Sequence, residues 1–280
     1  ARLLGYENYV EVGYYRMNRN SYGREEVENF RRQIKEYFVP LAEKMHERRR
    51  ERLGLQKLSY IDENMYFVDG NPKPQGTPEE IMANGQKMYE ELSPETKEFF
   101  EFMMENELFD VLGRKTKKAG GYMTYLPKYR APFIFANFNG TSGDVDVVTH
   151  ECGHAFQGYV SGSDPIEEHW DITMETAEIH SMSMEFFTEP WMNLFFKEEA
   201  DTYRQMHLED AIAFIPYGCM VDEFQHIMYA EPDLTPGERN AVWAKLESES
   251  RPWLDFAGLP FYGRGAGWQR QLHIYECPFY

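Results

Sequence analysis

Two histidines lie four residues apart in the segment Val145-Asp-Val-Val-Thr-His-Glu-Cys-Gly-His-Ala-Phe156, and a glutamate directly follows the first of them. If this segment is helical, His150 and His154 lie on the same face, and one zinc ion can bind both imidazoles at about 2.0–2.1 Å. Glu151 is rotated by about 100° from His150, which keeps it off the metal but within reach of a water there. The spacing therefore predicts two zinc ligands and a general base.

The flanking residues favour a helix over this segment. Gly143-Asp144 precedes the apolar positions and Gly162 follows them, as expected at helix ends. Apolar residues recur at helical spacing at Val145, Val148, Cys152, Ala155, Phe156 and Tyr159. Because Cys152 belongs to this apolar stripe, we expect it to pack in the core rather than to bind metal. A chance occurrence of the motif is the alternative.

A third zinc ligand is needed, since a catalytic zinc has three protein ligands and one open position. The segment 171–187 predicts a second helix with three acids, Glu175, Glu178 and Glu185. Its inward face is predicted to contain Ile172, Met174 or Ala177, Ile179, Met182 and Phe186. Acidic side chains usually lie on solvated faces, so the pattern alone does not choose a ligand among the three.

Three stretches of the chain match motifs of a known family, in the family's order. They are Pro132–Gly140 leading into Thr149–Gln157, then Ala177–Glu185, and Trp268–Tyr280, with weaker matches at Leu4–Asn8 and Gly70–Gln75. The chain thereby resembles the oligoendopeptidase F and thimet-oligopeptidase family of zinc metallopeptidases, and most closely the oligoendopeptidase F branch. The resemblance implies that the chain is truncated at both ends relative to the family.

The resemblance also implies roles for individual residues. It selects Glu178 as the third zinc ligand, and we expect Glu185 to orient a ligand histidine from outside the metal shell. It implies that His273 and Tyr280, and less directly Tyr275, donate hydrogen bonds to the oxyanion of the reaction. One such donor typically lowers the barrier by about 2.7–4 kcal/mol. The alternative for each is a packing role, because the chain has 19 tyrosines.

A short sheet is predicted beside the zinc-binding helix. The run Ala131–Phe138 is apolar and aromatic, is bounded by proline and Asn-Gly, and has the profile of a strand. The segment 120–126 is predicted to be its neighbour. In zinc peptidases of this kind an edge strand pairs with the substrate backbone, so Ala131–Phe138 is expected to be either that edge or a core strand.

The remaining chain is predicted to be largely helical. Residues 24–45 have apolar residues at helical spacing, with a kink at Pro40. Thr77 and Ser93, each followed by proline, are predicted helix caps. Further helices are predicted around 192–214, 219–229 and 236–249. We therefore expect a mainly α fold, a zincin-type helical metallopeptidase core with a small β-sheet next to the zinc-binding helix.

Charge and cysteine content limit the partners and the compartment. The formal net charge of −18 disfavours nucleic acid and anionic membranes as partners. The basic run 46–52 is predicted to be a solvated helix end. Three cysteines without a CxxC pair argue against a disulfide framework, and there is no apolar N-terminal signal or run of about 18 apolar residues. These features predict a cytoplasmic protein.

The expected function follows from the motif and the resemblance together. We expect residues 1–280 to form a single catalytic core that holds one Zn²⁺ per chain. Its reaction is predicted to be hydrolysis of internal peptide bonds in short oligopeptides, by a water that Glu151 activates. The alternatives are a zinc carboxypeptidase of similar helical build and a catalytically silent, metal-stabilised helical module. The sequence does not set the oligomeric state.

Overall fold

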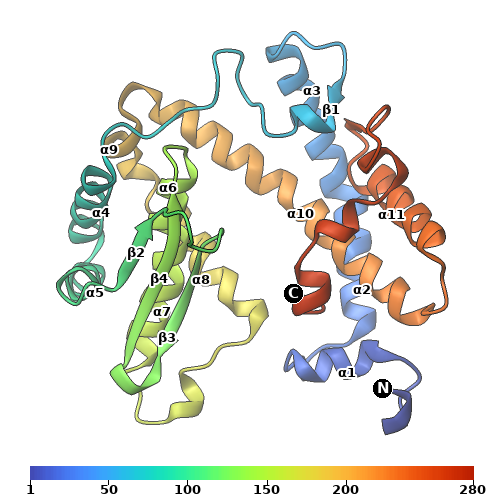
Figure 1. The fold of residues 1–280 in the computed structure, drawn as a ribbon, viewed down its shortest axis with the longest axis horizontal. Helices are drawn as coiled ribbons and strands as arrows, with labels where there is room; N and C mark the ends of the chain where they lie inside the picture. The colour runs from blue at the N-terminus through green and yellow to red at the C-terminus, as the bar shows by residue number, and fades with distance from the viewer. The chain divides into compact units, whose positions relative to one another are not determined.

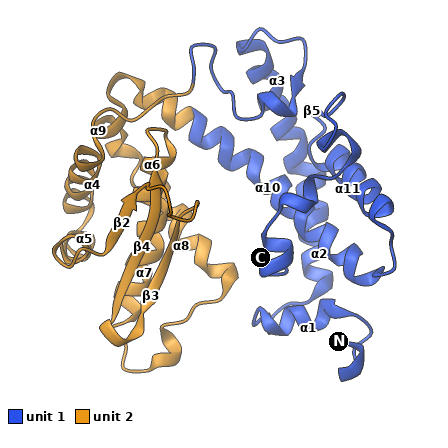
Figure 2. Ribbon diagram, in the orientation of Figure 1, with its two compact units in different colours: residues 1–70, 206–280 blue, residues 71–205 orange.

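The computed structural model describes residues 1–280, which divide into two compact units (Figure 2). Residues 71–205 form one, here called the sheet unit, and residues 1–70 with 206–280 form the other, here called the helical unit. The chain crosses between the units twice, once in the loop at Gly70–Asn71 and once inside the helix α10 (Ala200–Ala230).

The sheet unit contains a three-stranded sheet and six helices (Figure 1). Its helices are α4 (Pro78–Leu92), α5 (Pro94–Glu105), α6 (Gly143–Asp146), α7 (Cys152–Ser161), α8 (Met174–Phe187) and α9 (Met192–Phe196). Its strands are β2 (Phe109–Leu112), β3 (Tyr122–Leu126) and β4 (Ala131–Phe138). Thr77 and Ser93 cap α4 and α5 by accepting hydrogen bonds from backbone N–H groups, as predicted.

The strand order is β2-β4-β3, with β2 parallel and β3 antiparallel to β4. The predicted strand over residues 131–138 and its predicted neighbour are both confirmed. Of its two predicted roles, the core strand is confirmed and the substrate-pairing edge is wrong, because β4 has a strand on each side. The two edge strands are β2 and β3, and β3 contacts α7 in the predicted zinc-binding helix.

The predicted zinc-binding helix runs from Gly143 to Ser161, between the predicted ends. Its middle, Val147–Glu151, is a π-helical turn (η5) that joins α6 to α7. The apolar stripe faces inward as predicted, with Val148 and Cys152 almost fully buried. The hydroxyl of Tyr89 in α4 donates to the Val148 carbonyl at 2.9 Å and so binds a backbone group of the π turn.

The helix α8 forms where it was predicted, but its buried face is different. The side chain of Ile179 is 60% exposed and Phe186 is also exposed, whereas Ser181 and Met184 are buried. The reason is the close approach of α7 at Ser181, where a Cβ atom on Gly153 would lie 2.5 Å from the Ser181 Cα atom. A pattern that ranks residues by hydrophobicity does not detect a face selected for small size.

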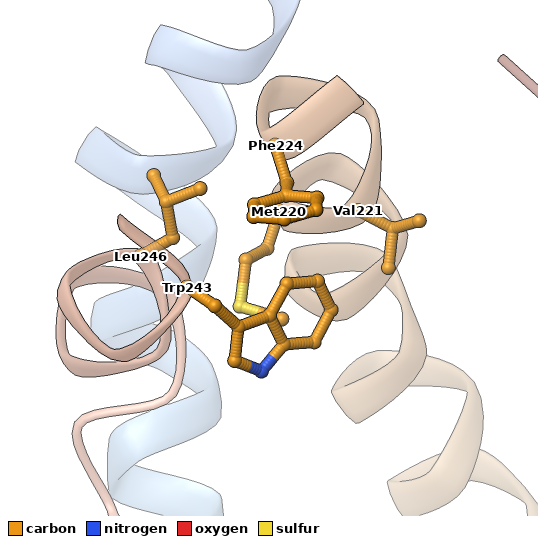
Figure 3. Packing of buried hydrophobic residues seen from close by; sticks show 5 residues of the cluster. All are labelled: Met220, Val221, Phe224, Trp243 and Leu246. Atoms are coloured by element: carbon orange, nitrogen blue, oxygen red, sulfur yellow. The ribbon is translucent and has the colours of Figure 1, made fainter. Parts of the chain in front are cut away.

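The helical unit contains α1 (Tyr9–Arg16), α2 (Arg24–Gln33), α3 (Val39–Arg52), α11 (Pro236–Ser250), α12 (His273–Glu276) and most of α10 (Ala200–Ala230). Two short strands, β1 (Leu58–Ser59) and β5 (Leu254–Asp255), pair in parallel. Figure 3 shows five side chains of one buried cluster in its core, from α10 and α11. They are Met220, Val221, Phe224, Trp243 and Leu246.

The kink predicted at Pro40 takes the form of a π turn over Ile34–Phe38. The Val39 N–H bonds the Ile34 carbonyl five residues back, just before the proline that cannot donate. A π turn adds one residue to a helical turn. Apolar residues that follow it at regular helical spacing therefore no longer lie on the same face as those before it. Among the apolar residues of the predicted helix 24–45, Phe30 and Leu41 are exposed, while Val39 and Ala42 are buried.

The basic run 46–52 ends a helix, as predicted, and Glu47, Arg48 and Glu51 are exposed, but the prediction that the run is solvated is wrong for His46 and Arg49. His46 and Arg49 are each only 1% exposed. The Arg49 guanidinium lies 4.6 Å from the centroid of the Tyr66 ring, and Arg52 makes a bidentate ion pair with Glu209 at 2.8 and 2.9 Å. Packing against aromatic and acidic partners offsets the cost of burying these charges.

The region 192–230 also differs from the prediction of two helices divided near residue 216. The short helix α9 is separate, and α10 continues through Pro216 for 31 residues. A proline in a helix interior costs about 3 kcal/mol. The buried contacts of Met220 and Phe224 beyond the proline offset this cost.

The predicted fold class is confirmed, because the structure is mainly α with a small sheet beside the predicted zinc-binding helix. No helix of the structure is long and apolar enough to span a membrane.

Candidate metal centre

Three side chains of the sheet unit converge on one point. His150 comes from the π turn, His154 from α7, and Glu178 from α8, which packs against α7 (Figure 1). The Glu178 Oε2 atom lies 3.2 Å from His150 Nε2 and 3.5 Å from His154 Nε2. The three potential ligand atoms all lie within 4.8 Å of one another, and the two imidazole rings are nearly perpendicular.

These distances fit a tetrahedral zinc ion. Two ligands bound at about 2.0–2.1 Å in tetrahedral geometry lie about 3.3–3.4 Å apart. The two distances from Glu178 lie on either side of this value. Two imidazole nitrogens and one carboxylate oxygen are also a donor set found in catalytic zinc sites, where the fourth position is open. The residues present therefore fit the metal that the motif predicts.

Further contacts orient the potential ligands. The Nδ1 atom of His150 lies 2.5 Å from Glu185 Oε1, so its Nε2 atom is the one directed toward Glu178. Ser181 donates a hydrogen bond to Glu178 Oε2 at 2.6 Å. Burial alone would lower the pKa of His150, but the carboxylates of Glu178 and Glu185 outweigh it and raise the pKa to about 10. The site therefore stabilises a positive charge.

The spacing between α7 and α8 depends on Gly153. A Cβ atom at this position would lie 2.5 Å from the Ser181 Cα atom and 2.7 Å from the His180 carbonyl oxygen. Both of these are backbone atoms, which cannot rotate away as a flexible side chain can. Glycine at the fourth position of the His-Glu-x-x-His motif thus permits the approach that brings Glu178 to the histidines.

Glu151 lies beside the three potential ligands but is not one of them. Burial raises the pKa of its carboxyl group, while His150, His154 and a hydrogen bond from the Met123 backbone N–H act in the opposite direction. A carboxylate whose pKa is raised toward neutrality is a better proton acceptor in catalysis. Met123 belongs to β3, so the free edge of the sheet contacts the potential base.

The other candidates from the sequence lie outside this cluster. Glu175, in the first turn of α8, is not among the groups within 4.8 Å of one another. Cys152 is fully buried beneath the motif, and burial raises the pKa of its thiol. Its packing role agrees with the prediction.

Sequence reasoning missed four supporting residues: Tyr89, Met123, Gly153 and Ser181. Tyr89 and Met123 reach the site only through folding and left no signal in the sequence. Gly153 and Ser181 had a usable signal, because small residues on two consecutive helices indicate that the helices pack closely.

His273 and Tyr280 belong to the helical unit, whereas the potential metal ligands belong to the sheet unit. The two rings lie 5.0 Å apart between centroids, and the exposed Tyr275 stacks on Trp268 at 6.3 Å. The segment that contains them is fixed at Phe279. Arg19 donates to the Phe279 carbonyl at 2.9 Å, and the Phe279 N–H donates to Gln225 at 2.8 Å.

Two imidazoles and a carboxylate on packed helices, with a half-buried second carboxylate beside them, define a candidate metal-dependent hydrolase. The family model of peptidase family M3 matches residues 1–280, and the chain belongs to this family. No curated protein matches the chain.

Solved structures agree with this family. One relative, assigned as an oligoendopeptidase F, is 55% identical with a TM-score of 0.97. A second, PZ peptidase A with an inhibitor, is 54% identical with a TM-score of 0.97. In both comparisons all of this chain aligns with 50% of the other. A third, assigned as an oligoendopeptidase F from Bacillus anthracis str. Ames, is 48% identical with a TM-score of 0.87, and 97% of this chain aligns with 51% of it. The chain thus spans about half the length of these relatives.

Proposed function

We propose that the chain is the catalytic core of a zinc-dependent endopeptidase that hydrolyses internal bonds of short oligopeptides. The observation that carries the proposal is the position of Glu178 Oε2, at tetrahedral ligand spacing from His150 Nε2 and His154 Nε2. Membership of peptidase family M3 supports the reaction class. The relatives assigned as oligoendopeptidase F support peptides as the substrate.

In this proposal His150, His154 and Glu178 hold the zinc ion, and Glu185 orients His150. When bound, zinc polarises the scissile carbonyl and lowers the pKa of water toward about 7. Glu151 accepts a proton from the attacking water and then delivers it to the leaving amine nitrogen. The burial that raises the pKa of Glu151 favours the first transfer, because it makes the carboxylate a stronger base.

The substrate backbone is proposed to pair with β3 rather than with β4. Strand β3 has β4 on one side only, and its Met123 N–H contacts Glu151. A peptide added along that edge would extend the sheet by backbone hydrogen bonds, which bind without regard to side-chain identity. Its carbonyl groups would then pass close to the potential base.

His273 and Tyr280 are proposed to donate hydrogen bonds to the oxyanion, and Tyr275 is the weaker candidate. The family resemblance supports these roles. In this proposal residues 1–280 act as one catalytic core that holds one zinc ion. The net charge of −18 supports peptides rather than nucleic acid or anionic membranes as partners, and three free cysteines support a cytoplasmic location.

The test is metal analysis combined with a cleavage assay. We expect about one zinc per chain and cleavage of an internally quenched fluorescent peptide, which a chelator abolishes and added zinc restores. Cleavage of a peptide blocked at both ends would identify an endopeptidase, whereas trimming that needs a free C-terminus would identify a carboxypeptidase. Folded protein that takes up zinc but cleaves neither peptide would be a catalytically silent module.

The choice of the third ligand has its own matched test. Glu178→Gln should lower zinc affinity by at least about 10-fold, because one of three ligands is lost, while Glu175→Gln on the same helix should leave it nearly unchanged. Equilibrium dialysis against a zinc-chelator buffer measures both. The reverse pattern would show that the ligand assignment on α8 is wrong.

A further inference from the structure

A chain of hydrogen bonds in the helical unit ends at His273. The hydroxyl of Tyr217 in α10 donates to Gln271 Oε1 at 2.7 Å. The Gln271 Nε2 atom lies 2.8 Å from His273 Nδ1. The side chain of Gln271 therefore lies between a phenol and an imidazole, and it contacts each through a different atom of its amide.

The chemistry of the amide determines which nitrogen of His273 has the proton. A carboxamide oxygen only accepts hydrogen bonds, and its nitrogen only donates them. Because the oxygen accepts from Tyr217, the nitrogen is the atom that faces His273. Nδ1 must then accept, so in the neutral ring the proton is on Nε2. The exposed His273 ring thus presents Nε2–H as a donor.

Packing holds the Tyr217 end of this series of hydrogen bonds in place. Tyr217 packs against the α10–α11 core shown in Figure 3, and the Arg251 guanidinium lies 5.0 Å from the centroid of its ring. Burial raises the pKa of Tyr217 to about 12, so its hydroxyl keeps the proton that it donates.

The segment that contains Gln271 is anchored on either side of it. Trp268 and Ile274 both pack against the same core. The Trp268 indole N–H also donates to Asn240 at 2.9 Å, and the Ile274 N–H donates to the Gln271 carbonyl at 3.2 Å. The amide therefore has a fixed position between its two partners.

We propose that Gln271 is a positioning residue that holds His273 in the tautomer with the proton on Nε2, so that this N–H is the donor offered to the oxyanion. The inference rests on the proposed function for the role of His273, but the tautomer itself does not. A neutral imidazole with the opposite tautomer would direct a lone pair at the developing negative charge and would repel it. Gln271 thus selects the tautomer of His273 that stabilises the oxyanion over the tautomer that destabilises it.

The decisive variant is Gln271→Glu, which has nearly the same shape. A carboxylate accepts with both oxygens, so it can bind His273 Nδ1 only when that nitrogen has a proton. In the neutral ring Nε2 is then a bare acceptor. The matched control is Gln269→Glu, which adds the same charge two residues away on an exposed side chain.

The first measurement is nitrogen NMR of protein labelled with ¹⁵N-histidine, at about pH 9, where imidazole is neutral. The His273 signals are assigned by their loss in His273→Ala. We expect the Nε2–H tautomer in the parent protein and in Gln269→Glu, and the Nδ1–H tautomer in Gln271→Glu. An Nδ1–H tautomer in the parent protein, or the same tautomer in all three proteins, would overturn the proposal.

The second measurement is peptide hydrolysis at the same pH, with zinc content checked for each protein. Gln271→Glu should lower kcat by roughly 10²–10³-fold, the effect of losing one oxyanion donor, and leave KM within about twofold. Gln269→Glu should leave both unchanged. A tautomer change with an unchanged kcat would refute the donor role of Nε2–H. If the parent protein cleaves no peptide, the proposed function fails, and the NMR result still decides what Gln271 does.

Discussion

The metal centre and the surroundings of His226 both contain a histidine whose two ring nitrogens have partners, yet the partners differ in kind. In the sheet unit, His150 faces two carboxylates, Glu178 and Glu185. In the helical unit, His226 faces the Tyr14 hydroxyl at 2.8 Å and the Arg31 guanidinium at 2.8 Å. His226 is also the more deeply buried of the two.

The difference shows what separates a candidate metal ligand from a structural histidine. The Nδ1 atom of His226 lies 2.8 Å from both the Arg31 guanidinium and the Asp222 backbone carbonyl, and its Nε2 atom lies 2.8 Å from the Tyr14 hydroxyl. The nearby carboxylate of Asp222 is paired with Arg31, so its charge is already compensated. The carboxylates of Glu178 and Glu185 raise the pKa of His150 and favour a cation at that point.

The largest expected effect separates the base from the ligands within the metal centre. Glu151→Gln keeps the shape and the three ligands but removes proton transfer, so turnover should fall by about 10²–10⁴-fold with zinc still bound. Turnover of a fluorescent peptide and metal content measure the two effects. Near-normal turnover would show that another group is the base.

The next effect tests whether His226 is purely structural. His226→Leu removes the hydrogen bonds to buried Tyr14 and Arg31, so we expect a loss of about 2–3 kcal/mol in the free energy of unfolding. Zinc content should stay unchanged, because the residue lies in the other unit. The measurements are urea denaturation and metal analysis. Loss of zinc from folded protein would contradict the distinction drawn between the two histidines.

A smaller effect is expected for the outer partner of His150. Glu185→Gln keeps the size of the side chain but weakens the hold on His150 Nδ1, which should reduce metal affinity or activity by about 10–100-fold. Competition with a zinc chelator measures the affinity. An effect as large as that of Glu178→Gln would mean that Glu185 binds the metal directly.

The smallest effect concerns the pH dependence of stability in the helical unit. Burial, and next the charge of Arg49, lower the pKa of His46 from 6.5 to about 4. Below about pH 6.5 the His46 imidazole is therefore protonated in the unfolded chain, while in the folded chain it stays neutral down to about pH 4. The free energy of unfolding consequently decreases as the pH falls from about 6.5 toward 4.

At pH 5 this difference should cost about 1–2 kcal/mol. His46→Phe keeps an aromatic ring against Trp253, which stacks on His46 at 4.4 Å, and should flatten the dependence. Urea denaturation of both proteins at pH 7.5 and pH 5 measures it. Parallel loss of stability in both proteins would assign the effect to other groups.

The parts of the fold that the sequence predicted well are those that depend on local chemistry. The strand over 131–138, the caps at Thr77 and Ser93, and the helix between Gly143 and Gly162 each have residues whose backbone preferences act within a few positions. The His-Glu-x-x-His spacing likewise needs only one helix. The choice of Glu178 needed a second helix at a known register, and for this the family resemblance was required.

The errors have long-range causes. Ser181, not Ile179, faces inward because α7 approaches too closely for a large side chain. Arg49 is buried because Tyr66 lies over it, and α10 continues through Pro216 because packing beyond the proline offsets a lost hydrogen bond. β4 is central because β2 pairs with its other side. None of these causes lies within one helical turn of the residue that it affects.

The contact at Gly153 also bears on which ions the site can hold. Backbone atoms of α8 stop the two helices at a fixed separation, and the ligand atoms on either side of that contact are about 3.2–3.5 Å apart. An ion that prefers bonds of about 2.3–2.6 Å, as calcium does, needs wider ligand spacing and more oxygen ligands than this site has. The lack of a side chain at Gly153 thus sets a ligand spacing in the candidate metal centre that suits a small ion.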